Sequence, residues 1–357
     1  MILYLIGNGF DLAHNLPTSY SDFMQYLQDE LNNILHLRNI DDKDILLKYP
    51  NKESIIIDNW IVNSFNDKDN VSNNPSGLYR AIYYKTLLEK YNKTGTWADL
   101  EQLYFELIFK NRKLEQRIKI INEEFEHLKM LLFNYLKEKV ESKSVPQNES
   151  IVQHIIKNQK KDSNVQFITF NYTSNLLGDY CNLVENLYSK KTESKDNLVI
   201  DLHKETKPEI IHIHGDLQNE PKDIIFGYGD DNSEQYNELK NLLNDDLLEN
   251  FKTFHYLKNS KYKDVLNLIE YLGLTSSQRL LGSSKIKVVS IGNSLSLCDK
   301  TLLKTIFTHK NVEEIEVAYH NNEKEYFKNI YNLARIIDDN ELMREKVVPL
   351  SETLEIS

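Results

Sequence analysis

Six short apolar runs, rich in β-branched residues, alternate along this chain with longer segments of helical periodicity. The runs are Ile2 to Ile6, Val165 to Phe170, Ile210 to Ile213, Ile224 to Phe226, Ile286 to Ile291 and Ile315 to Tyr319. Several are almost continuously hydrophobic, which is typical of strands buried on both faces of a parallel sheet. Most end in Gly, Asn, His or Asp, at the strand ends where α/β folds build their sites. The pattern therefore predicts an α/β fold around a parallel sheet.

The segments between these runs have a helical spacing. The clearest one repeats apolar residues every three or four positions, at Ile121, Phe125, Leu128, Leu132, Leu136 and Val140. Further helices are predicted at Tyr20 to Leu37, Leu78 to Lys90, Trp97 to Phe109 and Glu234 to Leu257. No Pro/Gly-rich linker borders the helical blocks, so we interpret them as insertions. Residues 1–20 and 160–357 are expected to form a Rossmann-like nucleotide-binding core, interrupted by helical insertions at 21–159 and 231–277.

Composition narrows the class of protein. The 357 residues are 40% hydrophobic and 27% charged, as in an ordinary globular protein. A net charge of −11 disfavours nucleic acid as a partner, and the basic run Lys110-Asn111-Arg112-Lys113 is interpreted as a solvated helix face. Two cysteines, Cys181 and Cys298, cannot form a disulfide framework or a four-cysteine zinc site. They fit a reducing, cytoplasmic compartment.

The hydrophobic segments give no sign of export or of membrane insertion. The apolar start from Met1 to Ile6 is too short for the core of a signal peptide and has no basic region before it. No apolar run approaches the ~20 residues of a membrane-spanning helix. We therefore expect a cytoplasmic protein without a membrane partner.

The first apolar run leads directly into Gly7-Asn8-Gly9-Phe10-Asp11 and then into a helical pattern. Glycines let a backbone turn tightly and approach a phosphate, and the N-terminus of the following helix offers free N–H groups. The motif is not a complete G-x-G-x-x-G, because Leu12 occupies the third glycine position. A tight strand–helix turn without a ligand is the structural alternative. The position of the turn after the first strand favours nucleotide binding.

Two later strand ends carry side chains suited to chemistry. Asn171, which follows Thr169 and Phe170, could hydrogen-bond ribose hydroxyls or hold a water, or could cap the next helix. Alternation along Ile210 to His214 predicts that His212 and His214 lie on the same side of the strand. A histidine at this edge is a natural general base.

The surroundings of these two histidines decide between their possible roles. Gly215 ends the strand, followed by Asp216, so His214 is expected to lie nearest the site. His212 is expected to be buried and hydrogen-bonded. Two histidines with no third spaced ligand do not favour a metal.

Two further strands end in glycine turns, at Phe226-Gly227 and at Gly292-Asn293-Ser294. The second repeats the strand–Gly-Asn arrangement of the first motif. Its backbone amides and Ser294 could hold the second part of a dinucleotide. A plain turn explains either segment equally well when it is taken alone.

Together these motifs resemble the AbiH family of bacterial abortive-infection proteins, which act in phage defence. The strongest part of the resemblance is Gly7 to His14, followed by Leu16 to Tyr20. Other matching segments are Trp97 to Glu101, Phe170 to Thr173, His212 to Gly215 and Ser290 to Ser294. The resemblance implies a role in defence against bacteriophage.

More distantly, the motif order is similar to that of sirtuins and sirtuin-like NAD-consuming proteins, which implies a sirtuin-type Rossmann-like fold. In that comparison Asn171 matches the Asn that works at the nicotinamide ribose, and His214-Gly215 matches the pair with the catalytic base. Gly7 to Phe10 matches the first cofactor loop, Phe226-Gly227 the substrate side, and Gly292 to Ser294 the loop at the adenosine ribose.

The chain departs from the sirtuin pattern at several points. Two cysteines cannot supply the sirtuin zinc module. Thr173 stands where an Asp is expected, and Asn8 and Asp11 stand where sirtuins have Ala and Ser. These departures disfavour protein deacetylation, but leave NAD cleavage or binding of another nucleotide open.

The resulting hypothesis is an NAD+ glycohydrolase with NAD+ as substrate, no metal, and Asn171 and His214 as catalytic residues. The predicted binding residues are Gly7, Asn8, Gly9, Phe10, Asp11, Thr169, Gly215, Asp216, Phe226, Gly227, Gly292, Asn293 and Ser294. Glu101 could be brought to the site by the helical insertion, or be an exposed helix carboxylate.

Two other functions fit the same sequence. One is a nucleotide-binding sensor without turnover, whose helical insertions bind a phage-derived trigger or a partner protein. The other is a metal-dependent nuclease or phosphohydrolase that uses Asp11, Asp216, Asp230 and Asp231. A homo-oligomer is compatible with all three functions.

Overall fold

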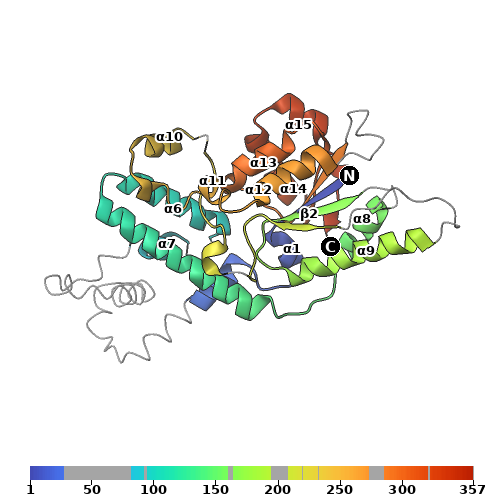
Figure 1. The fold of residues 1–357 in the computed structure, drawn as a ribbon, viewed down its shortest axis with the longest axis horizontal. Helices are drawn as coiled ribbons and strands as arrows, with labels where there is room; N and C mark the ends of the chain where they lie inside the picture. The colour runs from blue at the N-terminus through green and yellow to red at the C-terminus, as the bar shows by residue number, and fades with distance from the viewer. Residues whose placement is uncertain are drawn as a thin grey trace. The chain divides into compact units, whose positions relative to one another are not determined.

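The computed structural model divides into two compact units (Figure 1). The first unit comprises Met1–Thr18, Leu136–Ile225 and Thr253–Ser357, and the second comprises Ser19–Tyr135 and Phe226–Lys252. The residues that the structure describes are 1–27, 82–91, 95–159, 164–193, 208–218, 220–231, 233–272, 285–320 and 322–356. Among them, no helix is long and apolar enough to cross a membrane.

The first unit is built on a parallel sheet, which in the described residues has five strands in the order β3-β2-β1-β4-β5. The strands are β1 (Ile2–Ile6), β2 (Val165–Thr169), β3 (Ile210–His212), β4 (Ile286–Ile291) and β5 (Val312–Val317). This is the strand order of a doubly wound Rossmann-type fold, whose direction reverses between β1 and β4. The predicted α/β class and parallel sheet are confirmed.

Both faces of the sheet are covered, which explains the continuous apolar strands. On one face, Leu3 and Leu5 join a core with residues of α12 (Lys261–Asn267), α13 (Lys300–Phe307) and α14 (Glu323–Ile337). On the other face, Tyr4 stacks on Phe167 and meets His154 of α8 (Glu149–Gln159) edge-on. Helix α9 (Asn175–Glu193) lies beside α8, as Figure 1 shows. A strand with no solvent face needs no polar alternation.

Shorter elements complete the first unit. They are α1 (Asn8–Ala13), the π-helical η3 (Leu136–Val140) and η6 (Leu268–Leu272), the 3-10 segments η4 (Pro221–Asp223), η7 (Leu297–Asp299) and η8 (Leu350–Glu352), and α15 (Asn340–Lys346). Helix α11 (Lys252–His255) begins at the boundary between the units.

Two predicted strands differ in the structure. Ile224 to Phe226 is an irregular segment and not a strand. Its apolar residues are buried, and the Ile225 N–H donates to the His214 carbonyl at 2.7 Å. The run Ile315 to Tyr319 divides between β5 and β6 (Tyr319–His320), and β6 pairs with β7 (Glu355–Ile356) outside the main sheet. Burial alone makes a segment apolar, so hydrophobic runs overpredict strands.

The second unit is helical in its described residues. Residues 20–27 are helical, followed by α5 (Tyr83–Tyr91), α6 (Trp97–Asn111), α7 (Glu115–Tyr135), α10 (Glu234–Asn241) and the 3-10 segment η5 (Asp245–Leu247). The predicted helices at 97–109 and along the apolar stripe are confirmed. Residues 28–37 and 78–81 of two other predicted helices lie outside the described residues.

The remaining predicted helix, Glu234 to Leu257, is interrupted. Leu243 takes a left-handed φ of 53°, and the Asn244 side chain then accepts from the Asp246 N–H at 3.1 Å to start η5. A single left-handed residue ends a helix irrespective of the apolar spacing around it.

The boundaries between the two units differ from the predicted boundaries between the core and its helical insertions. Residues 136–159 and 253–272 belong to the first unit, although the sequence pattern assigned them to insertions.

Candidate functional site

Two glycine turns meet where the strand order reverses. Ile6 lies beside Ile291 in the sheet register, so the turns at Gly7 and Gly292 follow at the same level. A Cβ added to Gly7 would lie 2.5 Å from the Asn293 Cα, and one added to Gly292 would lie 2.0 Å from the Phe10 nitrogen. The Gly9 N–H donates to the Gly292 carbonyl at 2.7 Å. Glycine is required here because the two backbones touch.

A buried carboxyl group lies in α1, the short helix that follows β1. The side chain of Asp11 is almost completely buried and accepts a 2.8 Å hydrogen bond from the Thr173 hydroxyl. Burial raises the pKa of this carboxyl to about 7, although hydrogen bonds from Thr173 and Asn171 act in the opposite direction. The Asn171 amide also donates to the Gly7 carbonyl at 3.1 Å. Asp11 is therefore an ionisable group that changes charge near neutral pH.

The Asp11–Thr173 hydrogen bond joins α1 to the segment between β2 and α9.

His214 is part of a buried polar group at the end of β3. Its Nε2 lies 3.1 Å from an Asp299 carboxylate oxygen and 3.2 Å from the Tyr256 hydroxyl. The ring also meets Phe170 edge-on at 5.3 Å between centroids. A carboxylate beside a histidine orients the imidazole and stabilises its protonated form. Asp299 lies five residues after the Gly292-Asn293-Ser294 turn that the sequence singled out, whereas no sequence signal indicated Tyr256.

His212 has different neighbours from His214, contrary to the predicted shared side. The strand ends at His212, and residues 213–214 form a turn, so alternation does not extend to His214. The Nδ1 atom of His212 lies 3.3 Å from the Asn171 carbonyl oxygen. Burial lowers the pKa of His212, which favours its neutral form.

Several predicted binding residues have local structural contacts. Asn8 donates to the Thr18 carbonyl at 2.9 Å, and the Thr169 hydroxyl accepts from the Asn171 N–H at 3.0 Å. The Phe10 ring is buried against His14. These contacts shape the turns, and a role in ligand binding stays a prediction for each residue.

The other predicted residues of the first unit follow the same pattern. Gly215 has a φ of 90°, and Asp216 accepts from the Gln218 N–H at 3.0 Å. Asn293 accepts from the Leu295 N–H at 2.8 Å, whereas Ser294 is exposed. Their part in binding also stays a prediction.

Phe226 and Gly227 belong to the second unit and have partners there. Phe226 stacks on Phe125 at 5.2 Å between centroids. The Gly227 N–H donates to the Glu101 carboxylate at 3.0 Å, and Lys252 pairs with the same carboxylate at 2.9 Å. Glu101 is therefore buried, and its interpretation as an exposed helix carboxylate is wrong.

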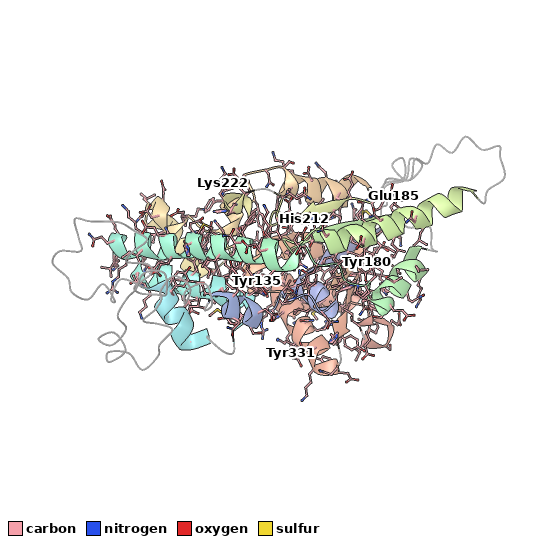
Figure 2. The ribbon with its side chains drawn as sticks, turned by 90° about the horizontal axis from the view of Figure 1, so that it is seen from below. Tyr135, Tyr180, Glu185, His212, Lys222 and Tyr331 are labelled. Carbon is pink, nitrogen blue, oxygen red and sulfur yellow. The ribbon has the colours of Figure 1, made fainter. Side chains whose placement is uncertain are left out.

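A surface pocket of about 660 Å³ lies in the first unit, and one of its lining residues, His212, is 3.3 Å from the Asn171 carbonyl oxygen. Figure 2 shows His212, one of its lining residues, near the first turns of α9. The pocket is lined by Glu141, Ser142, Lys143, Ser144, Val145, Ser174, Asn175, Leu176, Gly178, Asp179, Asn182, Ile210, His212, Asp216 and Gln218. Its residues come from the segment after η3, the start of α9 and the end of β3. Sequence reasoning missed Glu141, which has no motif around it.

Metal ligands do not assemble in the part of the chain that the structure describes, where no group of three or more His, Cys, Asp or Glu side chains could hold an ion. Asp11 and Asp216 lie in the first unit, and Asp230 and Asp231 lie in the second.

The fold and the strand-end residues define an α/β protein of the doubly wound type, with ionisable groups at the carboxyl edge of its sheet. The family model described as "Bacteriophage abortive infection AbiH" matches residues 3–321, so the chain belongs to the AbiH family. This membership implies a phage abortive-infection defence role. No curated protein matches the chain.

Proposed function

We propose that this AbiH protein is an NAD+ glycohydrolase, which cleaves the bond between nicotinamide and ribose. The observation that carries the proposal is the hydrogen bond between Asp11 and Thr173. It links Asp11, next to the segment that resembles the first sirtuin cofactor loop, to Thr173, two residues after the Asn that resembles the sirtuin residue at the nicotinamide ribose. The resemblance puts a hydroxyl and a carboxyl at these two positions in the opposite order. The Asn171 amide donates to the Gly7 carbonyl, and Asn171 also hydrogen-bonds Asp11.

The reaction balances without a metal or a second substrate. The bond between the ribose C1′ and the pyridinium nitrogen breaks, and its electron pair neutralises the departing nicotinamide. A water oxygen bonds to C1′, and the water gives up one proton. The products are nicotinamide, ADP-ribose and a proton. The transition state resembles an oxocarbenium ion, as in glycoside hydrolysis.

Each residue of the site has a role in this scheme. Asn171 orients the ribose or the attacking water. His214 accepts the proton, and Asp299 stabilises the imidazolium that forms, because its carboxylate lies 3.1 Å from Nε2. With a pKa of about 7, Asp11 is partly ionised at pH 7, and its charged form favours the positive charge that develops on the ribose. The turns at Gly7 and Gly292 hold the rest of the dinucleotide at the switch point of the sheet.

Nicotinamide release from NAD+ tests the proposal. It is measured for the wild type, His214→Ala and Asn171→Ala, with purified protein and in cells before and after phage infection. Lys222→Ala is the matched control, because this side chain is 75% exposed. We expect release from the wild type and the control, and a reduction of about 10²-fold or more in both site variants.

Three results would overturn parts of this proposal. Release that survives both substitutions excludes the assigned site. Binding of NAD+ with no release, before or after infection, identifies a sensor. Release that requires a divalent metal and occurs on other nucleotides identifies a metal-dependent phosphohydrolase.

A further inference from the structure

A buried polar cluster lies at the end of α1. His14, the residue that caps this helix, has two ring nitrogens with different partners. Its Nδ1 atom is 2.7 Å from the Phe10 carbonyl oxygen, and its Nε2 atom is 2.8 Å from the Tyr180 hydroxyl of α9. The N–H of Asn148, just before α8, donates to the same Nε2 atom at 3.0 Å and to the Tyr180 hydroxyl at 2.9 Å. One imidazole thus joins α1 to α8 and α9.

The backbone groups at the two ends of this cluster fix the protonation of His14. A carbonyl oxygen can only accept and a backbone N–H can only donate, so Nδ1 carries the proton and Nε2 is the acceptor. Burial of the ring lowers the pKa of His14, although the bond to the Phe10 carbonyl acts in the opposite direction, and the neutral form is favoured. His14 therefore holds one tautomer and connects the three helices in a fixed geometry.

The rings of the same cluster also pack on one another. The centroids of Phe10 and His14 are 4.7 Å apart, and Tyr180 of α9 (Figure 2) meets them edge-on at 5.2 Å and 5.6 Å. All three side chains are buried. Apolar packing and directional hydrogen bonds therefore act on the same contact between α1 and α9. A substitution that keeps a ring but removes the ring nitrogens separates the two contributions.

The cluster is connected to the candidate site through α1. His14 lies three residues after Asp11, a spacing that places the two side chains near the same face of a helical turn. Asp11 accepts from Thr173, just before α9 begins. His14 contacts Tyr180, which lies on α9 itself. Two separate attachments fix the rotation of α1 about its axis, whereas the Asp11 contact alone would leave that rotation free.

We propose that His14 is a positioning residue for the Asp11 carboxyl, which it keeps on Thr173 and away from water by holding α1 against α8 and α9. The inference rests on the proposed function only where Asp11 takes part in turnover. Burial is the main cause of the raised pKa of Asp11, so this pKa reports whether α1 is held. The charge of Glu141 adds to that cause, and Glu141 accepts from the Ser174 N–H rather than from α1.

Titration of Asp11 in three variants of His14 tests the inference. Carbon-13 NMR of the aspartate-labelled full chain follows the carboxyl groups, and Asp11→Asn assigns the signal of Asp11. His14→Phe keeps a ring without its nitrogens, so the pKa of Asp11 should fall from about 7 by about one unit or more as water reaches the carboxyl. His14→Asn retains a donor for the Phe10 carbonyl but is too short for the contacts of Nε2, and it should behave like His14→Phe. His14→Gln has an amide oxygen that can accept from the Asn148 N–H, and it should restore at least half of the change.

Tyr180→Phe removes the hydroxyl on α9 but leaves the other contact of Nε2, so it should lower the pKa of Asp11 by a smaller amount. Tyr326→Phe is the matched control, because it removes another buried hydroxyl of the first unit, which donates to the Val348 carbonyl. It should leave the pKa of Asp11 unchanged.

Circular dichroism shows which variants fold, and Tyr180→Phe provides the same test if His14→Phe does not fold. Three results would overturn the inference. They are a wild-type Asp11 that titrates near its ordinary value of 3.8, the same Asp11 pKa in the wild type and in the folded variants, and a His14→Gln variant that restores no more than His14→Asn.

Nicotinamide release distinguishes this inference from the glycohydrolase proposal. If both hold, His14→Phe should lower kcat about tenfold with little change in KM, because His14 acts through Asp11 and not on the bound dinucleotide. His14→Gln should recover part of that loss. A shifted Asp11 titration without release from the wild type supports the inference and contradicts the hydrolase. Release from the wild type with the same Asp11 titration in every variant supports the hydrolase and contradicts the inference.

Discussion

Glu101 in the second unit and Asp11 in the first are both buried carboxyl groups, but their partners differ. In the second unit, Glu101 faces the Lys252 ammonium and accepts from the Gly227 N–H. In the first unit, Asp11 is held by the neutral donors Thr173 and Asn171, and its pKa rises to about 7. The pair with Lys252 gives Glu101 a structural role in the second unit. Asp11 has no such cation among its described partners, and because burial raises its pKa to about 7, it changes charge near neutral pH and is available for chemistry.

The largest expected effect comes from breaking the pair in the second unit. Lys252→Met should lower the free energy of unfolding by about 3–5 kcal/mol, because it leaves Glu101 buried without its cation. Denaturant unfolding measures the loss. The double variant with Glu101→Gln should recover most of it, and Lys222→Met, at an exposed lysine, should change little. A loss of unfolding free energy below about 1 kcal/mol would show that Glu101 does not need its cation. The contrast between Glu101 and Asp11 would then not hold.

The next effect concerns the pH dependence of Asp11. Its folded pKa of about 7 is above its ordinary value of 3.8, so its contribution to stability is complete below pH 3.8 and is lost as the pH rises to about 7. At 1.36 kcal/mol per pH unit, the loss reaches at most about 4 kcal/mol. Asp11→Asn cannot titrate, so unfolding curves of the two proteins should diverge between pH 4 and 7. Parallel curves would show that Asp11 is ionised throughout this range.

A smaller effect tests the exchange of hydroxyl and carboxyl. Asp11→Ser and Thr173→Asp should each lower stability by about 1–2 kcal/mol, because each leaves one buried partner of the hydrogen bond unsatisfied. The double variant restores a hydroxyl–carboxyl pair in the sirtuin order and should recover at least half of the summed loss. Additive losses in this double-mutant cycle would mean that the two side chains are not coupled.

The smallest effect is expected at Tyr256. Tyr256→Phe removes the hydroxyl that lies 3.2 Å from the His214 Nε2 and leaves the ring in place. The net contribution of such a hydrogen bond is about 0.5–1.5 kcal/mol, and the Asp299 contact remains. Thermal unfolding and nicotinamide release should both change modestly. A loss of release as large as that of His214→Ala would instead place the hydroxyl in the chemistry.

Sequence reasoning succeeded where a local pattern was sufficient. The strands at Ile2–Ile6 and Ile286–Ile291 match their predicted bounds, because a strand covered on both faces is apolar at nearly every position. It failed at Ile224 to Phe226, where burial without strand pairing produces the same composition. It also missed the break at Leu243, since a left-handed residue leaves no trace in the apolar spacing.

In the candidate site, too, the sequence identified residues that belong to a local pattern and missed residues that only packing brings there. The sequence singled out Asn171 and His214 because each follows an apolar run with the pattern of a strand. It could not find Glu141, which enters the pocket from the segment after η3 and whose carboxylate accepts from the Ser174 N–H at 3.1 Å. Nor could it identify Tyr256 as a neighbour of His214, because the contact depends on how a loop returns to the sheet.

The sequence by itself determined the class of fold, the positions of the strand ends and the AbiH family, because these depend on patterns within short segments. Only the tertiary structure decided which strand ends meet. Asp11 and Thr173 are 162 residues apart, and their hydrogen bond exists because β1 and β2 are neighbours in the sheet although a long segment separates them in the chain. The same sheet order brings the Gly292 turn against Gly9. Contacts between distant segments depend on packing, which no local pattern encodes.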